Sequence, residues 1–134
     1  MIVADTKLIA HFFIPGDYTV DARSVFLKDP DWVAPLMWKS EFRKVVAMYL
    51  RQGYFNIKDA LAMASEAERL LHGNEYVVPA DSVLKMASES QCSAYDCEFA
   101  ALALDLGIKL VTPGKVILSA FPEIAVHIRK FEPL

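Results

Sequence analysis

Three carboxylates are the residues of this sequence best suited to do chemistry. Asp5 follows the apolar run 1–4, and Glu41 lies within a helical stretch. Asp96 opens a second helical stretch. Mg²⁺ and Mn²⁺ prefer oxygen ligands in proteins, and packed carboxylates are tolerable when a cation lies between them. If the fold brings the three acids together, they predict a divalent-cation site.

Such a site would suit the hydrolysis of a phosphodiester. A bound divalent cation activates water near neutral pH and stabilises the developing negative charge. A fourth acid would strengthen the site, but the strand-like run that ends at Thr112 is followed by Pro113 and Gly114. Glu98 is an auxiliary ligand candidate two residues past Asp96, although positions i and i+2 of a helix point in different directions.

The elements that would position these residues alternate between strands and helices. Short apolar, β-branched runs predict strands at Ile2–Asp5, Trp32–Ala34, Tyr76–Val78, Ile108–Val111 and Ala125–Ile128. Helical periodicity and capping residues predict helices at Lys7–Phe13, Val20–Lys28 (capped by Thr19), Leu36–Arg51, Ile57–His72 (capped by Asn56), Asp81–Ser90, Tyr95–Leu106 and Lys115–Ala120. This alternation predicts an α/β fold with a mostly parallel central sheet and helices on both faces. Sites in such folds gather beyond the carboxyl ends of the strands, where Asp5 and Thr112 fall.

Length and composition favour one globular domain spanning residues 1–134. The net charge of −3 argues against strong non-specific nucleic-acid binding, but not against RNA held locally through a metal. The two cysteines suggest reduced thiols in a cytoplasmic protein rather than a disulfide framework. No apolar run approaches the roughly 20 residues of a membrane span. The positive mean hydropathy suggests that a partner covers some apolar surface.

Four motifs, in order along the whole chain, resemble those of the PIN-domain family. Residues 2–6 resemble its opening strand with a terminal Asp, and residues 38–43 resemble the second acidic motif of VapC-type toxins. Residues 93–103 resemble the third motif, and residues 106–112 with Phe121-Pro122 resemble the closing one. The resemblance implies a PIN-like domain that acts as an endoribonuclease, with Mg²⁺ or Mn²⁺ at Asp5, Glu41 and Asp96. It also implies a cytoplasmic toxin of a type II toxin–antitoxin module, with a small antitoxin, an RNA substrate such as tRNA, and a homodimer.

The sequence departs from the family pattern at two positions. Gly114 stands where the fourth acid is expected, and Lys7 stands where the family has a small polar residue. The pocket is therefore about two charge units less negative, which weakens a site that relies on anionic oxygen ligands. The alternative function is a catalytically weakened PIN domain that acts by binding a protein partner or RNA.

Four further residues join the candidate site as auxiliaries. Lys7 has three interpretations: a solvated lysine, an internal cation that takes the metal position, or a phosphate contact. Thr112 is expected to hydrogen-bond nearby, and Thr6 directly follows Asp5. Arg43 either orients a carboxylate or meets a phosphate, or else it forms a plain exposed salt bridge.

Overall fold

The computed structural model describes residues 1–133 and is built on a five-stranded sheet with the strand order β3-β2-β1-β4-β5. Its strands are β1 (Ile2–Ala4), β2 (Trp32–Pro35), β3 (Glu75–Tyr76), β4 (Leu110–Thr112) and β5 (Ala125–His127). The four pairings between neighbouring strands are parallel. The expected α/β fold with a parallel sheet is therefore confirmed, and β1 lies at its centre.

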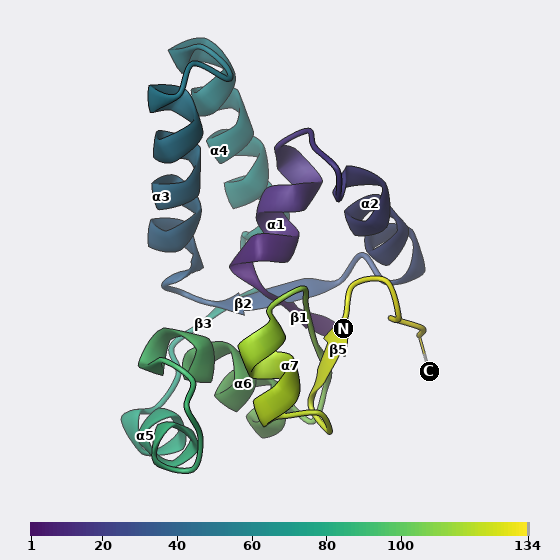
Figure 1. Cartoon of the computed structure of the whole chain (residues 1–134), viewed down its shortest axis with the longest axis vertical. Coiled ribbons are helices and arrows are strands. Elements are labelled where there is room, and N and C mark those ends of the chain that lie inside the picture. The colour runs from purple at the N-terminus through teal and green to yellow at the C-terminus, as the bar shows by residue number, and fades with distance from the viewer. Residues whose placement is uncertain (134) are drawn as a thin grey trace.

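Helices cover both faces of this sheet, as the sequence predicts. They are α1 (Thr6–Phe13), α2 (Thr19–Lys28), α3 (Trp38–Arg51), α4 (Ile57–Leu71), α5 (Ala80–Ser88), α6 (Ala94–Leu106) and α7 (Lys115–Ala120). Figure 1 shows α1 to α4 on one side of the sheet and α5, α6 and α7 on the other, with α3 and α4 projecting together as a hairpin. Within the described residues, the helices are too short or too polar to cross a membrane.

The central strands are buried on both faces, which explains their continuous apolar sequence. All residues of β1, β2 and β4 are buried. Trp32 and Trp38 are fully buried in the core, and each indole N–H still has an acceptor. Trp32 Nε1 donates to the carbonyl of Asp29 at 2.8 Å, and Trp38 Nε1 donates to Glu75 at 2.7 Å. The core is therefore apolar without leaving these two buried donors unpaired.

Local signals set most helix ends. Asn56 caps α4 by accepting from the Asp59 N–H at 2.9 Å, and Gly107 ends α6 in the left-handed conformation with φ +68°. The expected cap of α2 is wrong: Tyr18 is the N-cap, and Thr19 is the first helical residue. The Thr19 hydroxyl instead accepts from the Gly16 N–H at 2.9 Å in the preceding turn.

Two predicted boundaries are wrong because strand pairing decides them. Helix α3 begins at Trp38 rather than Leu36 because the Leu36 N–H still donates to the carbonyl of Tyr76 at the edge of the sheet. Strand β3 ends at Tyr76 because its partner β2 ends at Pro35, so Val77 has nothing to pair with and is 83% exposed. Strand β4 is shifted toward Thr112 and begins at Leu110. The other boundaries agree to within one or two residues.

Candidate functional site

Asp5 lies where the central strand ends and a helix begins. Its N–H donates to the carbonyl of Val111 in β4 at 3.2 Å, and its own carbonyl accepts from Ile9 at 3.1 Å in α1. Although Asp5 occupies the N-cap position of α1, its side chain does not cap the helix. The carboxylate instead accepts a hydrogen bond from Thr112 Oγ1 at 2.6 Å. The backbone therefore fixes Asp5 on both sides and leaves its carboxylate facing the end of β4.

Thr112 is the last residue of β4, and its hydroxyl forms two hydrogen bonds. It donates to Asp5 and accepts from the Gly114 N–H at 2.9 Å. The side chain is fully buried, so neither contact is exchanged freely with water. Thr112 thus fixes both the orientation of the Asp5 carboxylate and the loop that leads into α7.

The electrostatic environment of Asp5 shows which charges lie around it. The pKa of Asp5 is raised from 3.8 to about 6, chiefly because the group is buried. The negative charges of Asp96 and Glu41 also raise this pKa, whereas the Thr112 hydrogen bond and the positive charge of Lys7 lower it. The fold therefore brings the three candidate acids and Lys7 into one electrostatic neighbourhood.

Glu41 lies in the first turn of α3, on the opposite side of β1 from β4. Its carboxylate accepts a hydrogen bond from Thr6 Oγ1 at 2.7 Å, and Thr6 is itself buried. Burial raises the pKa of Glu98, and the negative charge of Glu41 raises it further. Glu98 therefore lies close enough to Glu41 to feel its charge. Thr6 and Thr112 thus play parallel parts, each orienting one acid of the site through a hydroxyl.

Asp96 enters the site from the first turn of α6, which lies on the other face of the sheet. The helix is capped by Ser93, whose hydroxyl accepts from the Asp96 N–H at 3.1 Å. Because Ser93 serves as the N-cap, the side chain of Asp96 is not needed for that purpose. The half-buried carboxylate is close enough to Asp5 for its charge to raise the Asp5 pKa.

The candidate acids offer only hard oxygen donors, but they do not form a ready-made enclosure for a metal ion. Asp5, Glu41, Asp96 and Glu98 supply only carboxylate oxygens, and their mutual repulsion would be relieved by positive charge. Across residues 1–133, no group of three His, Cys, Asp or Glu side chains stands close enough together to enclose a metal ion. Mg²⁺ needs only one or two protein carboxylates and retains several waters. The arrangement therefore suits such an ion better than a pair of metals with dedicated ligands.

Lys7 lies beside the position of the absent fourth acid. A Cβ atom placed on Gly114 would lie 3.8 Å from the Lys7 ammonium nitrogen and 3.2 Å from Thr112 Oγ1. Within residues 1–133, Lys7 forms no ion pair shorter than 4.0 Å. Its positive charge nevertheless lowers the pKa of Asp5. Lys7 thus acts on the site through space rather than through a direct contact with a carboxylate.

Arg43 is placed away from the acids. Its Nη2 atom pairs with Glu68 of α4 at 2.7 Å, and both side chains are exposed. Of the two interpretations of this residue, the structure contains the exposed salt bridge. The pair joins α3 to α4. An exposed pair of this kind contributes roughly 0–1 kcal/mol to stability.

Replacing Thr112 with Val is expected to destabilise the protein by about 1–3 kcal/mol, because the Gly114 N–H loses its acceptor and buried Asp5 loses its donor. The substitution should also raise the pKa of Asp5 further, since the Thr112 hydrogen bond lowers it. Denaturant unfolding at several pH values measures both effects. Thr112→Ser, which keeps the hydroxyl, is the control and should retain most of the stability.

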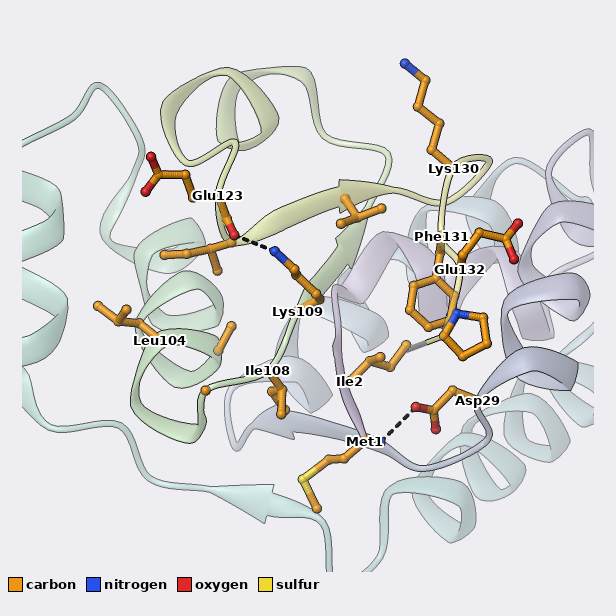
Figure 2. A pocket seen from close by; sticks show the side chains of 15 residues that line it. Met1, Ile2, Asp29, Leu104, Ile108, Lys109, Glu123, Lys130, Phe131 and Glu132 are labelled. Atoms are coloured by element: carbon orange, nitrogen blue, oxygen red, sulfur yellow. Dashed lines mark hydrogen bonds and ion pairs between the residues drawn. The ribbon is translucent and has the colours of Figure 1, made fainter.

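A cavity lies at the opposite end of the strands (Figure 2). It has a volume of about 620 Å³ and is lined by residues at the amino ends of β1 and β4, including Ile2 and Ile108, and by Phe131. Two cationic groups of its lining are already paired within it. The Met1 ammonium pairs with Asp29 at 2.8 Å, and Lys109 donates to the carbonyl of Glu123 at 2.6 Å. The candidate chemistry therefore lies away from this cavity, at the carboxyl ends of the strands.

Comparison with solved structures supports the fold at low sequence identity. The FitAcB structure from Neisseria gonorrhoeae has a TM-score of 0.77 and 17% identity, covering 98% of this chain and 100% of that one. PAE2754 from Pyrobaculum aerophilum has a TM-score of 0.71 and 17% identity over 95% and 90%. A toxin–antitoxin complex from Klebsiella pneumoniae has a TM-score of 0.69 and 14% identity over 99% and 100%. The expected PIN-like fold is therefore confirmed.

The similarity to known proteins is detected in the structure and not in the sequence. No protein-family model matches it, and no curated protein matches it. The similarity to the solved structures therefore establishes the architecture. The chemistry depends on the side chains at the carboxyl ends of the strands.

Proposed function

We propose that this protein is the ribonuclease component of a toxin–antitoxin module, hydrolysing RNA phosphodiester bonds with the help of one Mg²⁺ or Mn²⁺ ion. The observation that carries the proposal is the half-buried, poorly solvated carboxylate of Asp5, with a pKa raised to about 6 and the charges of Asp96 and Glu41 around it. A poorly solvated acid in a field of other acids is costly unless a cation is bound. Acids perturbed in this way cluster at functional sites.

The proposed site assigns a part to each residue. One or two of Asp5, Glu41 and Asp96 would hold the cation directly, and the remaining acid would act on it through its charge. The cation, when bound, would supply an activated water and stabilise phosphorane charge. Thr112 and Thr6 keep Asp5 and Glu41 oriented through their hydroxyls. Ser93 begins α6 so that Asp96 projects from its first turn. Glu98 adds negative charge near Glu41.

The toxin–antitoxin role is supported by the structural neighbours, one of which is a toxin–antitoxin complex. We infer that the partner is a small antitoxin and that the protein works in the cytoplasm as a homodimer. The exposed apolar side chains around the α3–α4 hairpin, Met48, Tyr54, Ile57 and Leu61, support a partner-covered surface. Size-exclusion chromatography with light scattering, at several concentrations, measures the homodimer.

The first experiment on the site is a calorimetric titration of Mn²⁺ into the parent protein and into Asp96→Ala. We expect saturable binding to the parent, and binding at least tenfold weaker to the variant, because a carboxylate that contributes to the ion's field has been removed. Asp105→Ala is the matched control: it removes an exposed Asp from the far end of the same helix and should leave the affinity unchanged. Equal binding by the parent and Asp96→Ala would contradict the proposed site.

A second candidate function is supported by Gly114 and Lys7. With no acid at position 114 and an ammonium group beside it, the protein would be a weakened PIN-like domain that binds a protein partner or RNA without cutting it. Cleavage of an RNA pool by the parent, lost in Asp5→Asn, supports the ribonuclease. Absence of cleavage together with absence of Mn²⁺ binding supports the weakened domain.

A further inference from the structure

A continuous series of basic and aromatic side chains leads away from the carboxylate site. Lys7 and His11 lie one helical turn apart on α1 and so share a face of that helix. The two are close enough that the charge of Lys7 lowers the pKa of His11, after the larger effect of burial. The imidazole of His11 lies beside the Tyr18 ring, with centroids 4.8 Å apart. The series therefore begins next to Asp5 and follows α1 toward α2.

Arg129 completes this series from a distant part of the sequence. Its guanidinium carbon lies 4.9 Å from the centroid of the Tyr18 ring. The Arg129 side chain is 56% exposed, whereas Tyr18 is half-buried. The guanidinium is therefore the solvent-side member of the stacked pair. Asp21 accepts a hydrogen bond from Nε at 3.0 Å, which holds the guanidinium plane over the ring.

A second route connects Arg129 back to the site through the sheet. The Arg129 N–H donates to His127 Nδ1 at 3.1 Å. His127 pairs with Thr112 in the register of β4 and β5, and Thr112 donates to Asp5. Two independent connections, one along α1 and one through β5, thus fix the stacked pair relative to the acids.

We propose that Lys7, His11, Tyr18 and Arg129 form a subsite for single-stranded RNA next to the carboxylates. Lys7 and Arg129 would meet phosphates, and a base would stack on the Tyr18–Arg129 pair. Aromatic rings and Arg guanidinium planes are the surfaces on which unpaired bases stack. The inference rests on the proposed ribonuclease function for the choice of RNA as ligand.

The charges around the acids support this assignment. A phosphate chain approaching Asp5, Glu41 and Asp96 is repelled unless cations lie along its path, and the net charge of the chain is −3. Lys7 has no ion-pair partner within 4.0 Å in the described part of the chain. Arg129 pairs with one acid through one nitrogen. Both cations can therefore accept a phosphate without first breaking a buried ion pair.

The test measures binding without cleavage. In an Asp96→Ala background, a fluorescently labelled single-stranded RNA oligonucleotide is titrated, and its anisotropy is followed at several salt concentrations. We expect Arg129→Gln to weaken binding about fivefold or more and to reduce the salt slope by about 0.7, the value for one phosphate contact on a single strand. Arg129→Lys keeps the charge and should retain the slope while losing affinity, because the stacking plane is gone.

The ring is tested separately from the charge. Tyr18→Leu should weaken binding about threefold to tenfold with the slope unchanged, because the guanidinium loses the ring that holds it flat beneath the base. Tyr18→Phe keeps the ring and should bind like the background protein, which also shows that any loss is not caused by misfolding. Arg51→Gln, an exposed arginine at the end of α3, is the charge-matched control and should change nothing.

The outcomes separate this inference from the proposed function. If the parent fails to cleave RNA but Arg129→Gln and Tyr18→Leu still weaken RNA binding, the subsite stands and the ribonuclease proposal fails. If both variants bind RNA as tightly as the Arg51→Gln control, the subsite is overturned whatever the parent cleaves. It is equally overturned if the two variants lose affinity only for a co-expressed protein partner.

Discussion

Replacing Asp5 with Asn is expected to raise the free energy of unfolding at pH 7 by about 2–3 kcal/mol, and to abolish RNA cleavage. The pKa of Asp5 is raised from 3.8 to about 6 mainly by burial, so at pH 7 the fold bears the cost of an ionised buried group. Asn removes that charge, and its amide oxygen can still accept from Thr112. Denaturant unfolding in EDTA, with parallel cleavage assays, measures both effects. A more stable but inactive variant is the pattern expected of a functional acid.

The dependence of this effect on pH follows from linkage. Because the folded pKa of Asp5 is higher than the unfolded one, the native state binds more protons between about 3.8 and 6. The contribution of Asp5 to stability is therefore greatest below pH 3.8, falls as the pH rises to about 6, and is level above that. Asp5→Asn should remove this fall, and the exposed control Asp17→Asn should not. A destabilised Asp5→Asn protein with the parent's pH profile would contradict the assignment.

Introducing the PIN-domain pattern with Gly114→Asp and Lys7→Asn together is expected to tighten Mn²⁺ binding at least tenfold, with a matching gain in RNA cleavage. The double change makes the pocket about two charge units more negative, which strengthens a site for a hard cation. The backbone of Gly114, at φ −71° and ψ 115°, suits an ordinary L residue. A Cβ there would lie 3.3 Å from Ile117 Cγ2 and 3.2 Å from Thr112 Oγ1, so both neighbours must shift slightly.

The two single variants show whether Lys7 and position 114 act on each other. Gly114→Asp alone should gain little affinity, because the new carboxylate would lie next to the Lys7 ammonium and pair with it. Lys7→Asn alone removes one positive charge and should give an intermediate gain. The double variant should then exceed the sum of the singles, as contacting residues do in a double-mutant cycle. Lys44→Asn, an exposed lysine on α3, controls for net charge. Additive effects would show that Lys7 does not face position 114.

The fold could be predicted well from the sequence because nearby residues determine where most helices and strands begin and end. The helix Lys115–Ala120 has the expected bounds, and Gly107 ends α6 where a left-handed residue is needed. The errors fall where a distant partner decides. Val77 is β-branched and apolar and so favours a strand, but the partner strand ends at Pro35. Leu36 fits the helical face of α3, but it is still hydrogen-bonded to Tyr76.

The candidate site was only partly predictable for the same reason. Acids at strand ends and in first helical turns could be found, because those positions meet at one edge of a parallel sheet. No local signal joins Tyr18 to Arg129, because 111 positions separate them and only the completed sheet brings them within 4.9 Å. Arg43 shows the converse, since its nearness to Glu41 in sequence did not bring it to the acids.

The strand order also determines when the acids can act during synthesis. Strand β1 emerges first but lies between β2 and β4, and the Thr112–Asp5 hydrogen bond spans 107 positions. At the usual 5–20 residues per second, the ribosome needs about 5–20 s to make the intervening chain. Until β4 is added, Asp5 is not enclosed, and a truncated or stalled chain has no assembled centre. Under the proposed ribonuclease function, a nascent protein of this topology would be harmless to the RNA that encodes it until nearly all of it has been translated.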